Sequence, residues 1–269
     1  MLPTSQRTAA YSLRVLVLGV LASIATTGCD IVTADLRHAA TSEWRKSYTL
    51  EPGGRLEVSN INGRIQVEAS QGNQVEIVAQ KKARGISEDA AKEAADRVEI
   101  KETVSSSSIR IETRMPQTSG MFRGSAEVSY SVRVPSGADV KLTTVNGGID
   151  LSRLTGKIDV ETTNGGIVAR EVGGAIQAST TNGGVEVELT QVASGGVKLE
   201  CVNGGIKLRL PSEAAATISA SVANGGIDAD GLKLETTDSS RRSLEARLNG
   251  GGPMIKIEGT NGGIKLAAR

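Results

Sequence analysis

Aromatic residues are nearly absent from this sequence. The 269 residues include one Trp, three Tyr and one Phe, against 32 Gly. A core without rings has to be built from Ile, Val, Leu and Ala in thin, repeated layers, which favours a stacked solenoid over a globule packed around bulky side chains. The same scarcity leaves few platforms on which a sugar ring could stack.

Histidine and cysteine are also scarce. The chain has one His, His38, and two Cys, Cys29 and Cys201. Zinc needs three or four ligands at suitable spacing, and a nucleophilic Cys or Ser needs a base nearby. We therefore predict no catalytic residues, no metal site and no cofactor. If Cys29 carries lipid, Cys201 has no partner for a disulfide, and we expect it to be a small buried side chain beside a turn.

Neither positive nor negative charge is in excess. Lys and Arg number 31 against 30 Asp and Glu, and the two signs are mixed along the chain. Phosphate binding requires a basic face with a strong electrostatic footprint. We therefore expect no nucleic-acid partner.

The first 28 residues have the layout of a secretion signal. Arg7 and Arg14 precede an apolar run from Val15 to Ala25, which is too short to span a bilayer. The "TTGC" that follows resembles the lipobox of bacterial lipoproteins, in which the Cys is lipidated and becomes the first residue of the mature chain. We expect residues 1–28 to be a lipoprotein signal peptide and Cys29 to be the lipidation site, with plain secretion or an uncleaved anchor as alternatives.

The next segments predict a tether and then a β-rich part. Residues 29–43 show no hydrophobic period and are expected to be a tether. Residues 44–140 include "YTLEPGGRLEVSNINGRIQVEAS", whose alternation predicts two strands joined at Asn62-Gly63. Over residues 87–97 the pattern predicts a short helix with Ser87 as N-cap and acidic residues in its first turn. Its shallow alanine face fits a lid on a neighbouring sheet.

Residues 141–269 repeat the motif Asn-Gly-Gly and are expected to be continuous with the preceding part. The motif begins at Asn146, Asn164, Asn182, Asn203, Asn224 and Asn261, at intervals of 18, 18, 21, 21 and 37 residues. Weaker glycine corners lie between the main ones. The unit is therefore a pair of half-coils of about nine residues, each a corner plus a short strand, as in a two-faced solenoid.

Asn-Gly is also the signal of an antiparallel type I′ hairpin, so a meander is the alternative to stacked rungs. Stacking is favoured because each main corner is followed by an apolar pair in the same phase. Equivalent Asn side chains could then hydrogen-bond along the stack, and Gly would keep each corner tight. Ile167, Ile206 and Ile227 should point inward, whereas Lys207 and Asp228 should point outward.

The last coil, "GTNGGIKLAAR" from Gly259, is expected to be the terminal rung of the stack. A terminal rung exposes unpaired backbone groups that invite another strand. Lys265 and Arg269 would blunt this edge, and we therefore expect a monomer.

Three features together resemble a bacterial "putative adhesin" family of β-strand-repeat envelope proteins of unknown function. They are "GGRLEVSNINGRIQVE", the short helix that follows it, and "YSVRVPSGADVKLTTVNGGIDL" with its run of "NGGI" coils, and the resemblance covers residues 48–269. It implies an all-β fold, a right-handed single-stranded parallel β-helix (β-solenoid) with one short helix inserted in the N-terminal part. It supplies no catalytic residues.

The favoured function is that of a non-catalytic, lipid-anchored cell-envelope protein whose solenoid is an adhesin-like structural or binding surface. It would contact the membrane through its N-terminal lipid, on the periplasmic side or the cell surface, and bind an envelope protein or polysaccharide. One alternative is a carbohydrate-active β-helix enzyme that uses a carboxylate pair, such as Asp228 with Asp230 or Asp159 with Glu161. The other is an envelope stress sensor that signals through the short helix.

Overall fold

The computed structural model describes residues 38–115 and 125–269, which belong to a single compact unit spanning residues 34–269. Within these ranges the chain is almost entirely β, as predicted. The elements are β1 (His38–Thr49), β2 (Arg55–Ser59), β3 (Ile65–Ser70), β4 (Gln74–Gly85), α1 (Glu88–Asp96), β5 (Glu99–Val104), β6 (Ser108–Arg114), β7 (Ser125–Pro135), β8 (Asp139–Asn146), β9 (Ile149–Ser152), β10 (Ile158–Asn164), β11 (Ile167–Val172), β12 (Ile176–Asn182), β13 (Val185–Leu189), β14 (Val197–Asn203), β15 (Ile206–Leu210), β16 (Ala216–Asn224), β17 (Ile227–Asp230), β18 (Leu234–Ser239), β19 (Ser243–Leu248), β20 (Met254–Asn261) and β21 (Ile264–Ala268).

The strands form two sheets. Sheet A has ten strands in the order β1-β4-β7-β3-β9-β11-β13-β15-β21-β17. Sheet B has eleven in the order β18-β19-β16-β20-β14-β12-β10-β8-β2-β6-β5. Most of the chain alternates between the sheets, so that a strand of sheet B, a corner and a strand of sheet A form one rung.

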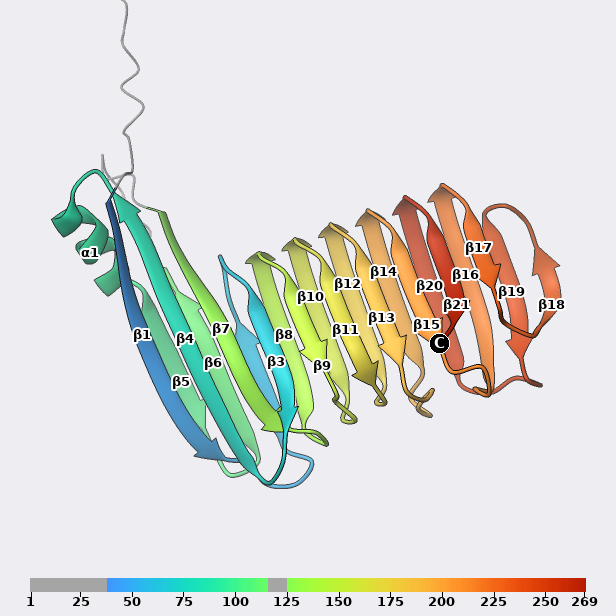
Figure 1. The fold of residues 1–269 in the computed structure, drawn as a ribbon, viewed down its shortest axis with the longest axis horizontal. Helices are drawn as coiled ribbons and strands as arrows, with labels where there is room; N and C mark the ends of the chain where they lie inside the picture. The colour runs from blue at the N-terminus through green and yellow to red at the C-terminus, as the bar shows by residue number, and fades with distance from the viewer. Residues whose placement is uncertain (1–37, 116–124) are drawn as a thin grey trace, which may run out of the picture. The chain divides into compact units, whose positions relative to one another are not determined.

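Neighbouring rungs pair in parallel and in matching register. In sheet B, Ile158 of β10 pairs with Ile176 of β12, and in sheet A, Ile167 of β11 pairs with Val185 of β13. Figure 1 shows the rungs β8–β9 to β14–β15 side by side in sequence order. The prediction of stacked parallel rungs is therefore confirmed, and the hairpin meander is not what these corners form.

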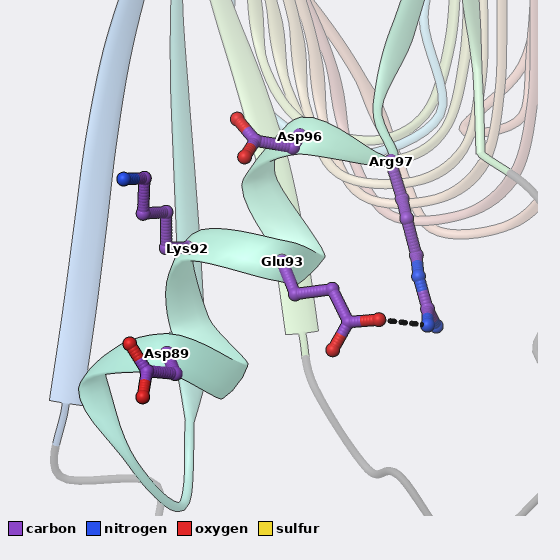
Figure 2. A pocket seen from close by; sticks show the side chains of 5 residues that line it. All are labelled: Asp89, Lys92, Glu93, Asp96 and Arg97. Carbon is purple, nitrogen blue, oxygen red and sulfur yellow. Dashed lines mark hydrogen bonds and ion pairs between the residues drawn. The ribbon is translucent and has the colours of Figure 1, made fainter.

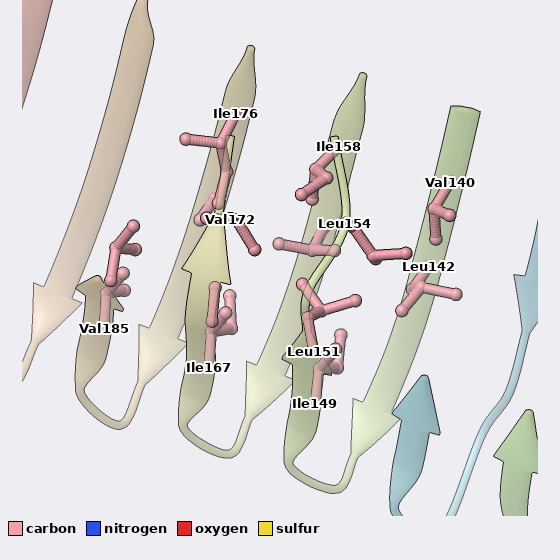
Figure 3. Close-up of a cluster of buried hydrophobic side chains, with 14 of the residues drawn as sticks. Val140, Leu142, Ile149, Leu151, Leu154, Ile158, Ile167, Val172, Ile176 and Val185 are labelled. Atoms are coloured by element: carbon pink, nitrogen blue, oxygen red, sulfur yellow. The ribbon is translucent and has the colours of Figure 1, made fainter. Parts of the chain in front are cut away.

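The core lies between the two sheets and consists of aliphatic side chains from alternate strand positions. Figure 3 shows such a cluster, including Ile149 and Ile167 of sheet A and Ile158 of sheet B, all fully buried. Fully burying one such side chain contributes about 1.5–3 kcal/mol. Ile206 is buried and Lys207 exposed, as predicted. Ile227, which was also predicted to point inward, is only half-buried because its strand is the last in sheet A.

The order of rungs in space departs from their order in sequence at both ends of the stack. Rung β20–β21 lies between rungs β14–β15 and β16–β17, pairing with both. Rung β2–β3 likewise lies between β8–β9 and the strands β6 and β7. The expectation that the last coil forms the terminal rung is therefore wrong. The long interval between Asn224 and Asn261 allows the chain to form the hairpin β18–β19 and then return to the inner position.

The N-terminal part contains antiparallel pairings between strands that the sequence did not indicate. Strand β4 pairs antiparallel with β7, β1 with β4, and β5 with β6. Strand β1 begins at His38, so residues 38–43 of the expected tether 29–43 are strand instead. An edge strand has one neighbour and stays mostly polar, with only Ala40, Trp44 and Tyr48 half-buried here, so its alternation is weak.

The predicted helix is present as α1. The Ser87 side chain accepts a hydrogen bond from the Ala90 N–H, as an N-cap does, and Arg97 forms an ion pair with Glu93. Ala91 and Ala95 are buried, and the helix packs against β4 and β1. The shallow alanine face therefore packs on sheet A over β4 and β1.

Candidate binding surface

The corner that contains Asn-Gly-Gly is built around very close contact between successive rungs. A Cβ atom added to Gly165 would lie 2.0 Å from the carbonyl oxygen of Gly147 in the neighbouring rung. The same clash, at 1.9 Å, would occur between Gly204 and Gly183. Only glycine fits this first position, because the obstructing atoms are backbone.

The second glycine of each corner is less constrained. A Cβ at Gly166 would lie 3.4 Å from its nearest neighbour, the Gly184 oxygen, which is ordinary contact. In rung β2–β3 the corner reads Asn62-Gly63-Arg64, with Arg at this second position. The sequence motif therefore combines one strict requirement with one tolerant position.

The Asn side chains form a continuous ladder on the outside of these corners. Each amide Nδ2 except that of Asn62, which donates to the Ala126 carbonyl, donates to the Oδ1 of the neighbouring rung at 2.8–2.9 Å. In spatial order the ladder runs through Asn62, Asn146, Asn164, Asn182, Asn203, Asn261 and Asn224. The amide ladder expected from the sequence is present, and it begins one rung earlier, at Asn62, which is 84 residues before Asn146 in the chain.

A second row lies two residues before the Asn ladder and points inward. The hydroxyls of Thr162 and Thr180 donate to the carbonyls of Gly147 and Gly165, and Cys201 Sγ lies 3.1 Å from the carbonyl oxygen of Gly183 in the equivalent place. Burial raises the pKa of the Cys201 thiol. The buried position predicted for Cys201 is confirmed, and its role is to continue the Thr row.

The inner row changes at its N-terminal end. Asn60 takes the place of Thr in rung β2–β3, and its Nδ2 donates to the carbonyls of Gly63 and Val128. The Gly63 oxygen is the acceptor that the Thr144 hydroxyl would use by analogy with Thr162. Asn60 Oδ1 and Thr144 Oγ1 are both buried, and neither has a hydrogen-bond partner among the described residues.

A third row lies between the other two and points outward. Its side chains immediately precede the ladder and, in the five central rungs, are Val or Thr. In spatial order the row contains Ile61, Val145, Thr163, Thr181, Val202, Thr260 and Ala223. Val145 and Val202 are 41% and 42% exposed, which is unusual for Val in this molecule. We call this row and the adjoining Asn ladder the corner ridge.

The corner ridge is regular because its backbone is fixed on both sides. Equivalent residues recur at the spacing of paired strands, about 4.8 Å. Amide groups, β-branched side chains and glycine backbone then form parallel lines across the rungs. Such a surface can meet an extended partner through repeated contacts, and it contains no group suited to bond-making chemistry.

The remaining residues considered from the sequence are not brought together. Cys29 lies outside the described residues. His38 begins β1 at the edge of sheet A, whereas Cys201 lies in β14 of sheet B. Asp228 and Asp230 lie on the exposed edge strand β17, and Lys265 is 3.7 Å from Asp228.

The other carboxylate pair considered, Asp159 and Glu161, lies on the outer face of sheet B. Lys141 is 3.8 Å from Asp159. Both residues belong to β10, where Asp159 is half-buried and Glu161 exposed among side chains of mixed charge. The geometry gives this pair the environment of a solvated sheet face.

Among the described residues of the N-terminal part, two surface hollows can be described. Figure 2 shows one beside α1, lined by Asp89, Lys92, Glu93, Asp96 and Arg97, with Glu93 turned toward Arg97. The second, of about 460 Å³, is lined by Ile61, Arg97, Glu99, Glu112, Thr113, Arg114 and Met115. Arg114 pairs with Glu112, so the charges of this second hollow are largely compensated.

Neither a metal-binding group nor a membrane-spanning helix is found in the ranges that the structure covers. Within residues 38–115 and 125–269, no three His, Cys, Asp or Glu side chains are placed to hold a metal ion together. In the same ranges no helix has the length and apolar character needed to cross a bilayer.

The fold is thus a two-sheet β-solenoid with a glycine-lined corner and an asparagine ladder. Residues 138–267 match the family model described as Toastrack DUF4097. The match begins just before β8 and covers the Asn-Gly-Gly coils. Comparison with curated proteins gives no match.

Several solved structures are similar to this chain at low sequence identity. One is a "putative cell adhesion protein" from Clostridium sporogenes, with 14% identity, a TM-score of 0.48, and coverage of 85% of this chain and 100% of that one. Another is a "putative adhesin" from Bacteroides fragilis, with 10% identity, a TM-score of 0.31, and coverage of 85% and 97%. A "Putative lipid binding protein" from Parabacteroides distasonis has 12% identity, a TM-score of 0.35, and coverage of 86% and 97%.

Proposed function

We propose that this is a non-catalytic, lipid-anchored protein of the bacterial cell envelope, and that its β-solenoid serves as an adhesin-like structural and binding surface. The corner ridge is the observation that carries the proposal. It presents an Asn amide at the same place in seven neighbouring rungs, which are held together by the amide ladder. A repeated, rigid surface pays little ordering entropy when an extended partner binds.

The anchor is proposed from the N-terminal sequence. Arg7 and Arg14, the short apolar run and the "TTGC" ending at Cys29 support export and lipidation. We propose an envelope protein or polysaccharide as partner, with the membrane contacted through lipid and no nucleic acid involved.

The experiment separates surface binding from anchoring. The double variant Thr163→Lys with Thr181→Lys places two charges on the ridge, in rungs β10–β11 and β12–β13. The control Val168→Lys with Gln177→Lys adds the same charge to the outer sheet faces of the same rungs. Binding of the purified full chain to isolated envelope fragments, and separately to envelope polysaccharide, should fall about tenfold for the ridge variant and remain unchanged for the control.

Lipidation is tested in parallel by Cys29→Ser. This variant should lose lipid labelling and leave the membrane fraction while its folded part still binds envelope material. If both lysine pairs have equal effects, or if all binding disappears with Cys29→Ser, the surface proposal fails and only the anchor remains. Cleavage of any polysaccharide in the same assay would favour the enzyme alternative instead.

A further inference from the structure

The N-terminal end of sheet A leaves a long strand edge open. Among the described strands, β1 is the last of sheet A and has β4 as its one neighbour. Its register with β4 is unbroken from His38 opposite Gly85 to Thr49 opposite Gln74. The other side of β1 presents backbone N–H and C=O groups in a regular line, which is a template for a further strand.

The other sheet edges are shorter or less regular. At the opposite end of sheet A, β17 has four residues, Asp228 and Asp230 among them. In sheet B, β18 has six residues and its pairing with β19 shifts register between Thr236 and Asp238, while β5 has six residues. Short length, irregular pairing and charge are the usual protections of an edge, and β1 has twelve regular residues.

Strand β1 also concentrates aromatic side chains in a chain that has few. Trp44, the single Trp of the sequence, and Tyr48 both lie on its inner side, half-buried. The Tyr48 hydroxyl donates to Glu102 on β5, so β1 is tied to the end of sheet B. Trp and Tyr are enriched at protein interfaces, where a half-buried ring can become fully buried.

We propose that this chain forms a two-fold symmetric dimer in which β1 pairs antiparallel with β1 of a second copy, joining the two copies of sheet A. Two-fold symmetry requires the inner faces of both sheets to lie on the same side. Residues that face one another must then both be odd-numbered or both be even-numbered, because side chains alternate along a strand. The symmetry axis therefore passes through a residue that faces its own copy.

Charge selects the residue on that axis. When Trp44 lies there, Glu43 of each copy faces Arg45 of the other, giving two opposite-charge pairs, and Ser42 faces Lys46. Moving the axis to Glu43 or Arg45 places two like charges directly opposite, which is destabilising. In the single chain Glu43 and Arg45 are exposed and contact each other at 3.0 Å on one face of the strand, so both can reach across to a second copy.

The sequence-based expectation of a monomer rested on a blunted terminal rung. The structure places that rung between two others, with Lys265 beside Asp228 and Arg269 beside Glu188. The edge relevant to self-association is thus at the opposite end of sheet A, and the charges on it are self-complementary.

Charge reversal tests the register directly. Sedimentation velocity of the full chain in detergent should show a dimer, and Glu43→Arg or Arg45→Glu should each raise its dissociation constant by about tenfold or more. The double variant Glu43→Arg with Arg45→Glu should restore the dimer to within about threefold, because the opposite-charge pairs are re-formed. This rescue also shows that loss in the single variants is not caused by misfolding.

Two further measurements complete the test. Glu76→Arg, an equal charge change one strand inside the edge on β4, should leave the dimer intact. Trp44 fluorescence should shift to shorter wavelength with increasing protein concentration in the unmodified chain and not in the single variants. A monomer at about 0.1 mM, or a dimer unaffected by either single reversal, would overturn the proposal.

Discussion

At each end of the stack one rung lies out of sequence order, but the two ends finish their sheets differently. At the N-terminal end, rung β2–β3 lies inside β6 and β7, and antiparallel strands then extend both sheets, β5 in sheet B and β4 with β1 in sheet A. At the C-terminal end, rung β20–β21 lies inside β16–β17, and the hairpin β18–β19 extends sheet B alone.

The two ends together show that a repeated corner specifies that rungs stack but does not specify which rungs become neighbours. Any Asn-Gly-Gly corner can stack on any other, because the glycine contact and the amide bond are the same in each pair. The ladder accordingly passes from Asn203 to Asn261 and only then to Asn224. Which rungs become neighbours depends on the connecting segments, and both displaced rungs are joined to the stack by unusually long ones.

The position of rung β20–β21 between two other rungs can be tested by disulfide formation, which either occurs or does not. Lys198 pairs with Lys256 across β14 and β20, and Lys256 in turn pairs with Ser219 of β16. The double variant Lys198→Cys with Lys256→Cys should therefore form a disulfide on oxidation, because directly paired strand positions lie within bridging distance. Lys198→Cys with Ser219→Cys should not, and peptide mass spectrometry after oxidation distinguishes the two. The reverse result would mean that the rungs follow sequence order.

The middle and the end of the stack should differ in their tolerance of a buried charge. Ile206→Asp should cost about 4 kcal/mol in the free energy of unfolding, because a carboxylate would replace a fully buried side chain. Ile227→Asp, at the equivalent place in the half-buried end rung, should cost about half as much. Denaturant unfolding measures both, with the exposed Lys207→Asp as control, expected to change stability by under about 0.5 kcal/mol. Equal losses at the two Ile positions would remove the distinction between middle and end.

Backbone contact at the corners provides a second comparison. Gly165→Ala should cost about 3 kcal/mol, because the added methyl would overlap the Gly147 carbonyl and rungs on both sides prevent a shift. Gly225→Ala makes a similar overlap with Gly262, but its rung is the last of the parallel stack and can move outward, so we expect a smaller loss. Thermal unfolding of both, beside Gly166→Ala as the tolerant second position, checks this. A loss for Gly166→Ala as large as that for Gly165→Ala would show that close stacking is not the reason for the glycine.

The sequence predicted the local structure well because each rung repeats the same phase. Ile206 and Lys207, the Ser87 cap and the amide ladder all follow from alternation or from a local motif. The neighbours of rung β20–β21 could not be predicted, because Asn261 fits equally against Asn203 or Asn224. The prediction of a tether is wrong for residues 38–43, because an edge strand such as β1 needs few apolar residues to form.

Only part of the corner ridge could be predicted from the sequence. The Asn residues that bond one another have the motif in common, so the ladder could be predicted from spacing. The exposure of Val145 and Val202 could not be predicted, because Val most often points inward. Both residues point outward because the residue before each of them belongs to the inward-pointing Thr row.

The amide ladder itself should show a smaller difference between middle and end. Asn182 donates to Asn164 and accepts from Asn203, whereas Asn224 donates to Asn261 and accepts from no Asn in the described part of the chain. Asn182→Ala should therefore cost about 1.5 kcal/mol and Asn224→Ala about half of that. Amide hydrogen exchange at the flanking glycines should rise more for Asn182→Ala. If the end substitution costs as much as the central one, the ladder does not act through pairwise hydrogen bonds.

A similarly small effect concerns Cys201, where the inner row changes from Thr to Cys. Thr162 and Thr180 show that a hydroxyl at this place donates to the glycine carbonyl one rung away, and Cys201 lies in the same geometry against Gly183. Cys201→Thr should therefore keep stability within about 1 kcal/mol of the unmodified chain, with the hydroxyl taking over the thiol's contact. Cys201→Val fills similar space without a donor and should be less stable than Cys201→Thr by about 1 kcal/mol. Thermal unfolding of the two variants, compared with each other, isolates the hydrogen bond. If Cys201→Val is as stable as Cys201→Thr, the inner row is held by packing alone. The change from Thr to Cys between the middle and the C-terminal rungs would then have no effect on stability.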